Sequence, residues 1–180
     1  MDAHDYLDRI LELYAPTFDI ERQREAGGVF FDAYGFFSSL SEKYVLVKDA
    51  RLWAVNTYEH AFFKVVDAIS KKDIDAAGDL IRGPLQSGFV TKGRKYPEKD
   101  HMHSLITVVY VSRKAVGEDA VASLGRFRYD RSYLFNFRGY CEGRIIAVDL
   151  EDSKVYTSKA ASSLKGLYEG AMDGSLTRRI

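Results

Sequence analysis

Hydrophobic side chains recur with a period near 3.6 residues in four parts of the chain. Leu7, Ile10, Leu11 and Tyr14 have the i, i+3, i+4, i+7 spacing that is typical of one buried helix face. The same pattern predicts four helices, over residues 3–15, from Ser70 to Gly83-Pro84, over 117–124 and over 159–169.

The second of these helices has clear end signals. Ser70 is the expected N-cap, and Asp73 stands three residues later, in a capping-box position. Gly83-Pro84 either ends the helix or kinks it before a further turn that carries Leu85 and Phe89.

Apolar residues elsewhere alternate or run continuously, as in β-strands. Residues 28–66 are rich in aromatic and β-branched side chains and predict a meander of three or four strands. Residues 104–111 form an apolar run that predicts a buried strand. Residues 17–27 are polar and end in two glycines, so we expect a connection there.

Three further strands are expected between Arg131 and Thr157. Residues 131–141 place Tyr133, Phe135 and Phe137 at every second position, which predicts a strand with an aromatic face. Residues 144–150 read as an interior strand, and residues 154–157 as a hairpin partner.

These elements predict a single mixed β-sheet flanked by helices. The expected order is α-βββ-α-β-α-βββ-α, an α/β class on the borderline of α+β. Its first part has the element order of a restriction-endonuclease-like core, which is an analogy of topology alone. We expect one globular domain over residues 1–172 and a flexible tail over residues 173–180.

Composition places the chain among ordinary globular proteins. Its 180 residues carry 26 basic and 26 acidic side chains, and this balance argues against a general polyanion-binding protein. The single cysteine excludes an internal disulfide and fits a reducing compartment. With no signal peptide or transmembrane run recognised, we expect a cytoplasmic protein.

Positive charge is concentrated beside aromatic residues in one segment. Arg126, Arg128, Arg131 and Arg138 give four positive charges between residues 126 and 138, against one acid. Basic residues interleaved with aromatic ones can contact phosphates and stack on bases, so nucleic acid is one expected partner. The alternative is that the aromatic side chains belong to the core and the arginines face water.

Histidines and acids offer a second kind of site. His101 and His103 are two apart, so a regular strand would present both rings on one face to a divalent metal. Glu59 or His60 could complete the site of a metal-dependent hydrolase if the strands are neighbours. Two surface histidines are the alternative, and no other cofactor is expected, because phosphate-binding glycine motifs are absent.

We also considered a nuclease site, a cysteine nucleophile and assembly into a homo-oligomer. A nuclease site would draw on Asp32, Asp49, Glu59 and Lys64, but Glu59 and Lys64 are five apart and point to opposite faces, which predicts a degenerate site. Cys141 has no neighbouring histidine, so we expect a buried structural thiol. Aromatic faces could instead join copies of the chain in a homo-oligomer, through residues such as Phe30, Tyr34 and Phe36.

Three segments, EKYVLVKDARLWAVNTYEHAFF (42–63), KDHMHSLITVVYV (99–111) and FNFRGYCEGRIIAVDLEDSKVYTSK (135–159), resemble a family of short uncharacterised prokaryotic proteins. The resemblance covers most of the chain and implies a self-contained domain, without a reaction or a ligand. The residues themselves favour a non-enzymatic binding or interaction protein.

Overall fold

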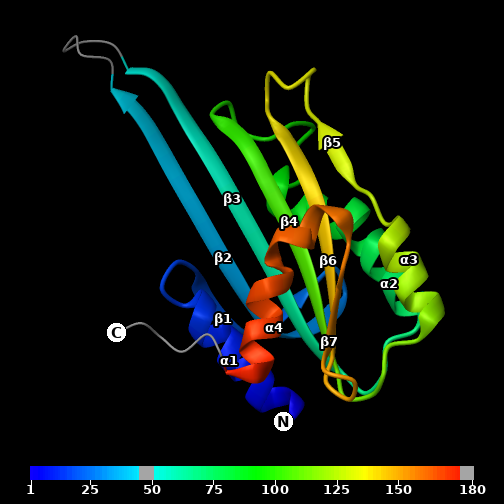
Figure 1. Ribbon diagram of the computed structural model, residues 1–180. Helices are drawn as coiled ribbons and strands as arrows, with labels where there is room; N and C mark the ends of the chain where they lie inside the picture. The colour runs from blue at the N-terminus through cyan, green and yellow to red at the C-terminus, as the bar shows by residue number, and fades with distance from the viewer. Residues whose placement is uncertain (45–50, 175–180) are drawn as a thin grey trace.

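A computed structural model of the chain describes residues 1–44 and 51–174, and the side chains of residues 40–55 are not among those it describes. The described part is a single mixed sheet of seven strands with helices on both faces (Figure 1). The strand order is β1-β2-β3-β4-β6-β5, and β7 also pairs with β6. The predicted fold class and element order are therefore confirmed.

The elements follow one another as α1 (Ala3–Tyr14), β1 (Asp19–Ala26), β2 (Val29–Tyr44), β3 (Arg51–Val66), α2 (Lys71–Leu80), the π-helix η1 (Ile81–Val90), β4 (His101–Ser112), α3 (Glu118–Arg126), β5 (Asp130–Ser132), β6 (Tyr140–Asp149), β7 (Lys154–Thr157), the 3-10 helix η2 (Lys159–Leu164) and α4 (Lys165–Asp173).

The sheet combines an antiparallel half with a parallel half. β1, β2 and β3 are successive antiparallel neighbours, whereas β3, β4 and β6 run parallel. Both β5 and β7 are antiparallel to β6, at its beginning and its end respectively. β2 and β3 reach beyond the helical layers at one end of the sheet (Figure 1).

Two hydrophobic cores lie on the two faces of the sheet. On one face, α2, η1 and α3 cover a core that includes Phe31, Phe62 and Ile106. On the other face, α1 and α4 cover a core that includes Phe63, Val109 and Ile146. Adjacent residues Phe62 and Phe63 serve opposite cores because successive side chains of a strand point to opposite faces.

The end signals predicted for the helices are present. The Asp2 carboxylate accepts a hydrogen bond from the His4 backbone N–H at 2.8 Å and so caps α1. The Asp73 carboxylate accepts from the Ser70 N–H at 2.8 Å, which closes the capping box of α2. The chain does not stop at Pro84 but continues through it in η1, whose wider turns carry Leu85 and Phe89.

Residues 19–26 correct the prediction of a polar connection. They form β1, which pairs with β2 from Asp19 to Ala26. An edge strand exposed over most of its length needs no hydrophobic face, because its stability comes from backbone pairing with β2. Its sequence therefore carries no alternation that would reveal it.

The strand predicted over residues 131–141 is also wrong. β5 ends at Ser132, and residues 133–139 form a loop in which Leu134, Phe135 and Asn136 have positive φ angles of 49°, 51° and 68°. The loop satisfies its own backbone, since Phe137 N–H donates to Leu134 O and Gly139 N–H to Asn136 O, both at 2.9 Å. The alternating aromatic residues thus belong to a folded loop.

The flexible tail expected over residues 173–180 stays a prediction. α4 ends at Asp173 with Gly174 in the left-handed conformation, and residues 175–180 lie outside the described part. Within the described part, no helix is both long and apolar enough to cross a membrane.

Candidate functional site

A cavity of about 600 Å³ lies on the η1 face of the sheet, above β1, β2 and β3. This volume is within the range of small-molecule sites, roughly 300–1,000 Å³. Five of the thirteen described residues that line the cavity contribute rings, Tyr34, Phe36, Tyr58, His60 and Phe89.

The floor of the cavity is a row of rings on β2 and β3. Phe36 pairs with His60 in the strand register, and their ring centroids are 5.2 Å apart with planes inclined by 28°. Tyr58, two residues before His60 on the same strand, stacks beside Phe36 at 6.2 Å and 15°. Side chains at these positions share a face because residues two apart on a strand, and residues paired across strands, point the same way.

The roof comes from η1. The Phe89 ring lies 5.3 Å from the His60 ring and 5.6 Å from the Tyr34 ring. The Arg24 guanidinium from β1 lies over the rings of Tyr34 and Phe89, 5.4 Å from the Tyr34 centroid and 5.7 Å from the Phe89 centroid. This cation–π contact closes the side of the cavity at the sheet edge.

One polar pair is buried among these rings. The Tyr34 hydroxyl and His60 Nδ1 are 2.7 Å apart. Burial, with a smaller contribution from Lys92, lowers the pKa of His60 to about 4, and burial raises the pKa of Tyr34. Both groups are therefore neutral near pH 7. One proton lies in the hydrogen bond between them, and in either tautomer of His60 one further proton of the pair, on Nε2 or on the Tyr34 hydroxyl, is left to donate elsewhere.

Four of the five described charged side chains that line the cavity form two ion pairs, and Asp19 is the fifth. Arg24 Nη1 lies 2.6 Å from Glu21 Oε2, and Lys92 Nζ lies 3.3 Å from Glu98 Oε1. The Tyr58 hydroxyl also donates to Glu98, at 3.4 Å. The bases are thus neutralised by neighbouring acids, and the cavity presents little uncompensated positive charge to a ligand.

The histidines of the predicted metal site are separated by a β-bulge. Asn56 pairs with His101 but Thr57 pairs with His103, so Met102 is an extra residue on β4. The bulge turns His101 toward Tyr58 and Tyr133 on the cavity face, whereas His103 stacks on Tyr140, with centroids 4.0 Å apart, on the other face. The expectation that both rings share a face is wrong, since it assumed a regular strand.

Both nitrogens of His101 are engaged in hydrogen bonds. Nδ1 donates to the Arg138 carbonyl at 2.8 Å, and Nε2 accepts from the Ser104 hydroxyl at 2.8 Å. Burial lowers the pKa of His101, and it lowers that of His103 to about 4. In the part of the chain that the structure describes, no three His, Cys, Asp or Glu side chains lie close enough to hold a metal ion together.

Glu59 and His60 point to opposite faces of β3. Glu59 accepts a hydrogen bond from the Thr107 hydroxyl at 3.2 Å and lies 3.7 Å from Arg144 Nη1. Burial raises the pKa of Glu59, and Arg144 opposes that shift. The carboxylate therefore takes part in a polar cluster on the α1/α4 face, away from the cavity.

The residues expected in a nuclease site do not come together in the described part of the chain either. The Asp32 carboxylate accepts from the Val65 backbone N–H at 2.7 Å, which joins β2 to β3. Asp49 lies outside the described residues. Glu59 and Lys64 lie on opposite faces of β3, as their spacing predicts.

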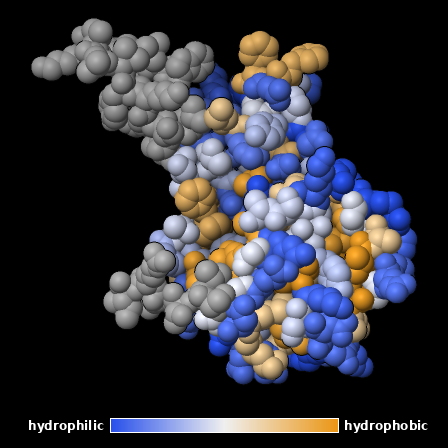
Figure 2. All heavy atoms as spheres, in the orientation of Figure 1, coloured by the Kyte–Doolittle hydropathy of each residue, from blue (hydrophilic) through white to orange (hydrophobic). Residues whose placement is uncertain are grey.

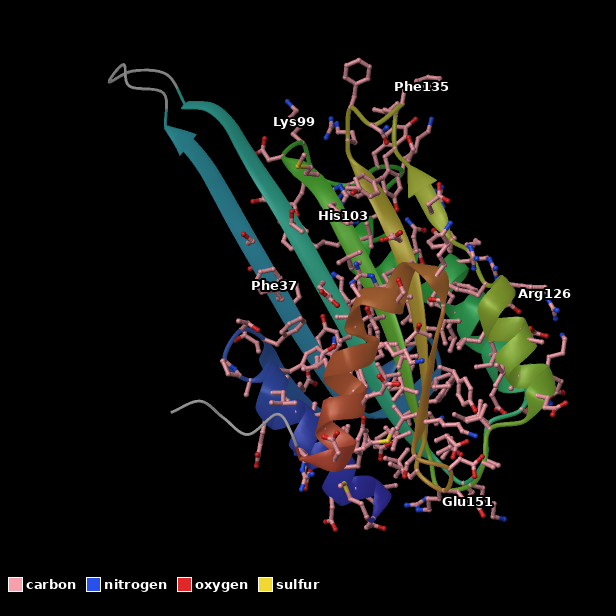
Figure 3. The ribbon with its side chains drawn as sticks, viewed as in Figure 1. Phe37, Lys99, His103, Arg126, Phe135 and Glu151 are labelled. Atoms are coloured by element: carbon pink, nitrogen blue, oxygen red, sulfur yellow. The ribbon has the colours of Figure 1, made fainter. Side chains whose placement is uncertain are left out.

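The four arginines fall into two groups. Arg126 and Arg128 lie at the end of α3, where Arg128 donates to the carbonyls of Gly125 and Phe127. Arg131 donates to Gln86 and Arg138 to the Pro97 carbonyl, each at 3.3 Å, near the loop of residues 133–139. Figure 3 shows Arg126 well separated from Phe135.

Cys141 is fully buried in the core of the cavity face, and burial raises its thiol pKa to about 12. Such a thiol is protonated and inert, as predicted. Tyr34, expected on an outer face that could join copies of the chain, is instead buried in the cavity wall.

Of the residues that line the cavity, only His60 was expected in a binding site. Phe36 and Tyr58 occupy every-second positions with Tyr34 and His60, and this alternation was the available signal. Phe89 could not be found from the sequence, because its place depends on how η1 packs over β2 and β3.

A family model described as "Domain of unknown function (DUF8052)" matches residues 2–170. The chain therefore belongs to this family, in agreement with the predicted resemblance. No curated protein and no solved structure matches it.

Proposed function

We propose that this chain is a non-enzymatic binding protein of the cytoplasm, and that it holds a flat, uncharged small molecule in the cavity between η1 and the β1–β3 half of the sheet. The observation that carries the proposal is the ring-lined cavity with one neutral polar pair, Tyr34 and His60, at its wall.

The rings favour a flat ligand. A planar molecule in the cavity would bury its faces against these rings, and it would lie beside the Phe89–His60 contact rather than between the two rings, whose centroids are 5.3 Å apart. Each aromatic pair contributes about 0.5–1.5 kcal/mol beyond the burial of its area. A few such contacts are enough for selective binding of a ring system.

The polar groups favour an uncharged ligand with one hydrogen-bond acceptor. The buried pair has one remaining donor, the Nε2–H of His60 or the Tyr34 hydroxyl, because its other proton lies in the hydrogen bond between the two side chains. A charged ligand would lose hydration on entering the cavity. Arg24 and Lys92 at the rim would compensate an anionic ligand poorly, because they already pair with Glu21 and Glu98.

The same features favour binding over catalysis. A general base needs a free lone pair and a pKa near the working pH, but burial holds the His60 pKa at about 4. Tyr34 keeps its proton for the same reason.

The proposal is tested with a pair of fragments that differ by one acceptor, 1-indanone and indane. We expect both to bind wild-type protein weakly, in titrations followed by protein NMR. In the double variant Tyr34→Phe/His60→Phe, 1-indanone should bind about tenfold more weakly, the value of one hydrogen bond, while the affinity for indane stays the same.

The double substitution is preferred to either single one, since it leaves no buried polar atom without a partner. The matched control is Tyr110→Phe, which removes a buried hydroxyl that does not line the cavity. Equal losses for both fragments would contradict the hydrogen-bond role of His60, and no binding of either to wild-type protein would contradict the proposal itself.

A further inference from the structure

Two phenylalanines are almost completely exposed at one end of the sheet. Phe135 is 94% and Phe137 is 86% accessible to solvent, in the loop between β5 and β6. Phe135 points away from the body of the protein (Figure 3), and Figure 2 shows apolar side chains projecting from this end. We call residues 133–139 the β5–β6 tip. Exposure this complete is not explained by folding, because a buried ring would be more favourable.

The β5–β6 tip has a defined conformation. Phe137 N–H donates to Leu134 O and Gly139 N–H donates to Asn136 O, as described above. In addition, Tyr133 N–H donates to Gly139 O at 2.9 Å and Asn136 N–H donates to the Ser132 hydroxyl at 3.1 Å. Below it, the buried Tyr133 hydroxyl accepts from Gln86 at 2.7 Å. Positive φ angles at Leu134 and Phe135 are unfavourable for such residues, so this conformation is maintained against a local cost.

The surroundings of the tip combine apolar and basic side chains. Met102, at the start of β4, is half-exposed, and Leu134 and Tyr140 are partly so. The neighbouring loop of residues 91–100 carries four bases and two acids. The two loops are joined where Arg138 donates to Pro97 and accepts from His101. Lys99 lies at the same end of the sheet (Figure 3).

We propose that the β5–β6 tip inserts Phe135 and Phe137 into the headgroup region of an anionic lipid bilayer, with the nearby basic side chains against the lipid phosphates. Aromatic rings are favoured at this depth, and bases near the surface add attraction to anionic lipids. The proposal is tested at Phe135, Phe137 and Lys99, none of which lines the cavity, so it does not depend on the ligand proposal.

The shape of the tip disfavours the other occupants. A second copy of the chain would need roughly 800 Å² of matching surface on each partner, whereas the tip is a narrow projection of a few side chains. Single-stranded nucleic acid would need a basic groove beside the rings, but Arg131 and Arg138 donate to Gln86 and Pro97.

Cosedimentation with vesicles tests the inference. We expect the full chain to bind vesicles of phosphatidylglycerol mixed with phosphatidylcholine, and to bind pure phosphatidylcholine more weakly. Phe135→Ser/Phe137→Ser should lower the partition coefficient roughly tenfold or more, and Lys99→Glu should lower it only on anionic vesicles. The control is Phe30→Ser, which changes an exposed phenylalanine in the β1–β2 hairpin and should leave binding unchanged.

Three results would overturn the inference. The first is a wild-type chain that does not bind anionic vesicles, and the second is a double variant that binds them as well as wild type. The third is a wild-type chain that does not bind vesicles but has another association that the double variant loses. Loss of oligonucleotide binding would assign the tip to nucleic acid, and loss of a dimer in light scattering would assign it to a second copy.

Discussion

Gly139→Ala is expected to destabilise the protein by about 3 kcal/mol, the sum of a strained backbone and an overpacked contact. Gly139 has a φ of +70°, and a Cβ there would lie 2.1 Å from the Met102 carbonyl oxygen. The Cβ is attached directly to the backbone of the β5–β6 tip, and the three atoms nearest to it are backbone atoms of Met102, so neither side can move aside cheaply. Urea denaturation measures the change.

Gly28→Ala separates the two causes. Gly28 also has a positive φ, +75°, but a Cβ there would have open space around it. We expect a loss of about 1 kcal/mol, from the backbone strain alone. Equal losses in the two variants would mean that the close approach of Gly139 to Met102 does not exist in solution.

Acid is expected to destabilise the folded protein through His60. Its pKa is about 4 in the folded state, below the ordinary value of 6.5, so the unfolded chain takes up the proton first as the pH falls. The contribution of His60 is fully present above about pH 6.5 and is lost as the pH falls toward 4. Between pH 7 and pH 4.5, this group should lower the free energy of unfolding by about 2–3 kcal/mol.

The measurement is urea denaturation of wild type and of Tyr34→Phe/His60→Phe at both pH values. The carboxylates, His101 and His103 titrate in both proteins, so the difference between the two pH dependences isolates His60. Near it, Lys92 is the charged side chain that also lowers the His60 pKa. Parallel pH dependences in the two proteins would show that His60 is not buried in its neutral form.

The helices could be predicted because their signals are local. The stripe of α1 and the Ser70–Asp73 capping box lie within a few residues of each other, and each is present in the structure. Apolar runs likewise revealed β4 and most of β6, whose side chains are buried on both faces.

The two failures have different causes, a polar edge strand paired within a hairpin and a close contact between residues distant in sequence. β1 is held by backbone pairing along the sheet edge, and the β5–β6 tip by Gly139 fitting against Met102. Alternating Tyr133, Phe135 and Phe137 match a strand pattern, but a run of positive φ angles places the first ring inside and the other two in solvent.

The site could be predicted less well than the fold. His101 and His103 have the spacing of a metal pair, and a single bulge at Met102 separates them. The cavity needs the register of β2 against β3 and the position of η1 across both, and neither is contained in the spacing of residues along the chain.

Binding to the cavity is the central claim, and Gly88→Phe tests it most directly. Gly88 lines the cavity from η1, and a Cβ there meets open space, so the new ring can occupy the cavity without disturbing the fold. Gly166→Phe in α4 is the matched control, also with open space, on the opposite side of the sheet. NMR titration with 1-indanone should show binding lost in Gly88→Phe and kept in Gly166→Phe, with both variants as stable as wild type. Unchanged binding in Gly88→Phe would show that the ligand lies elsewhere and would contradict the account.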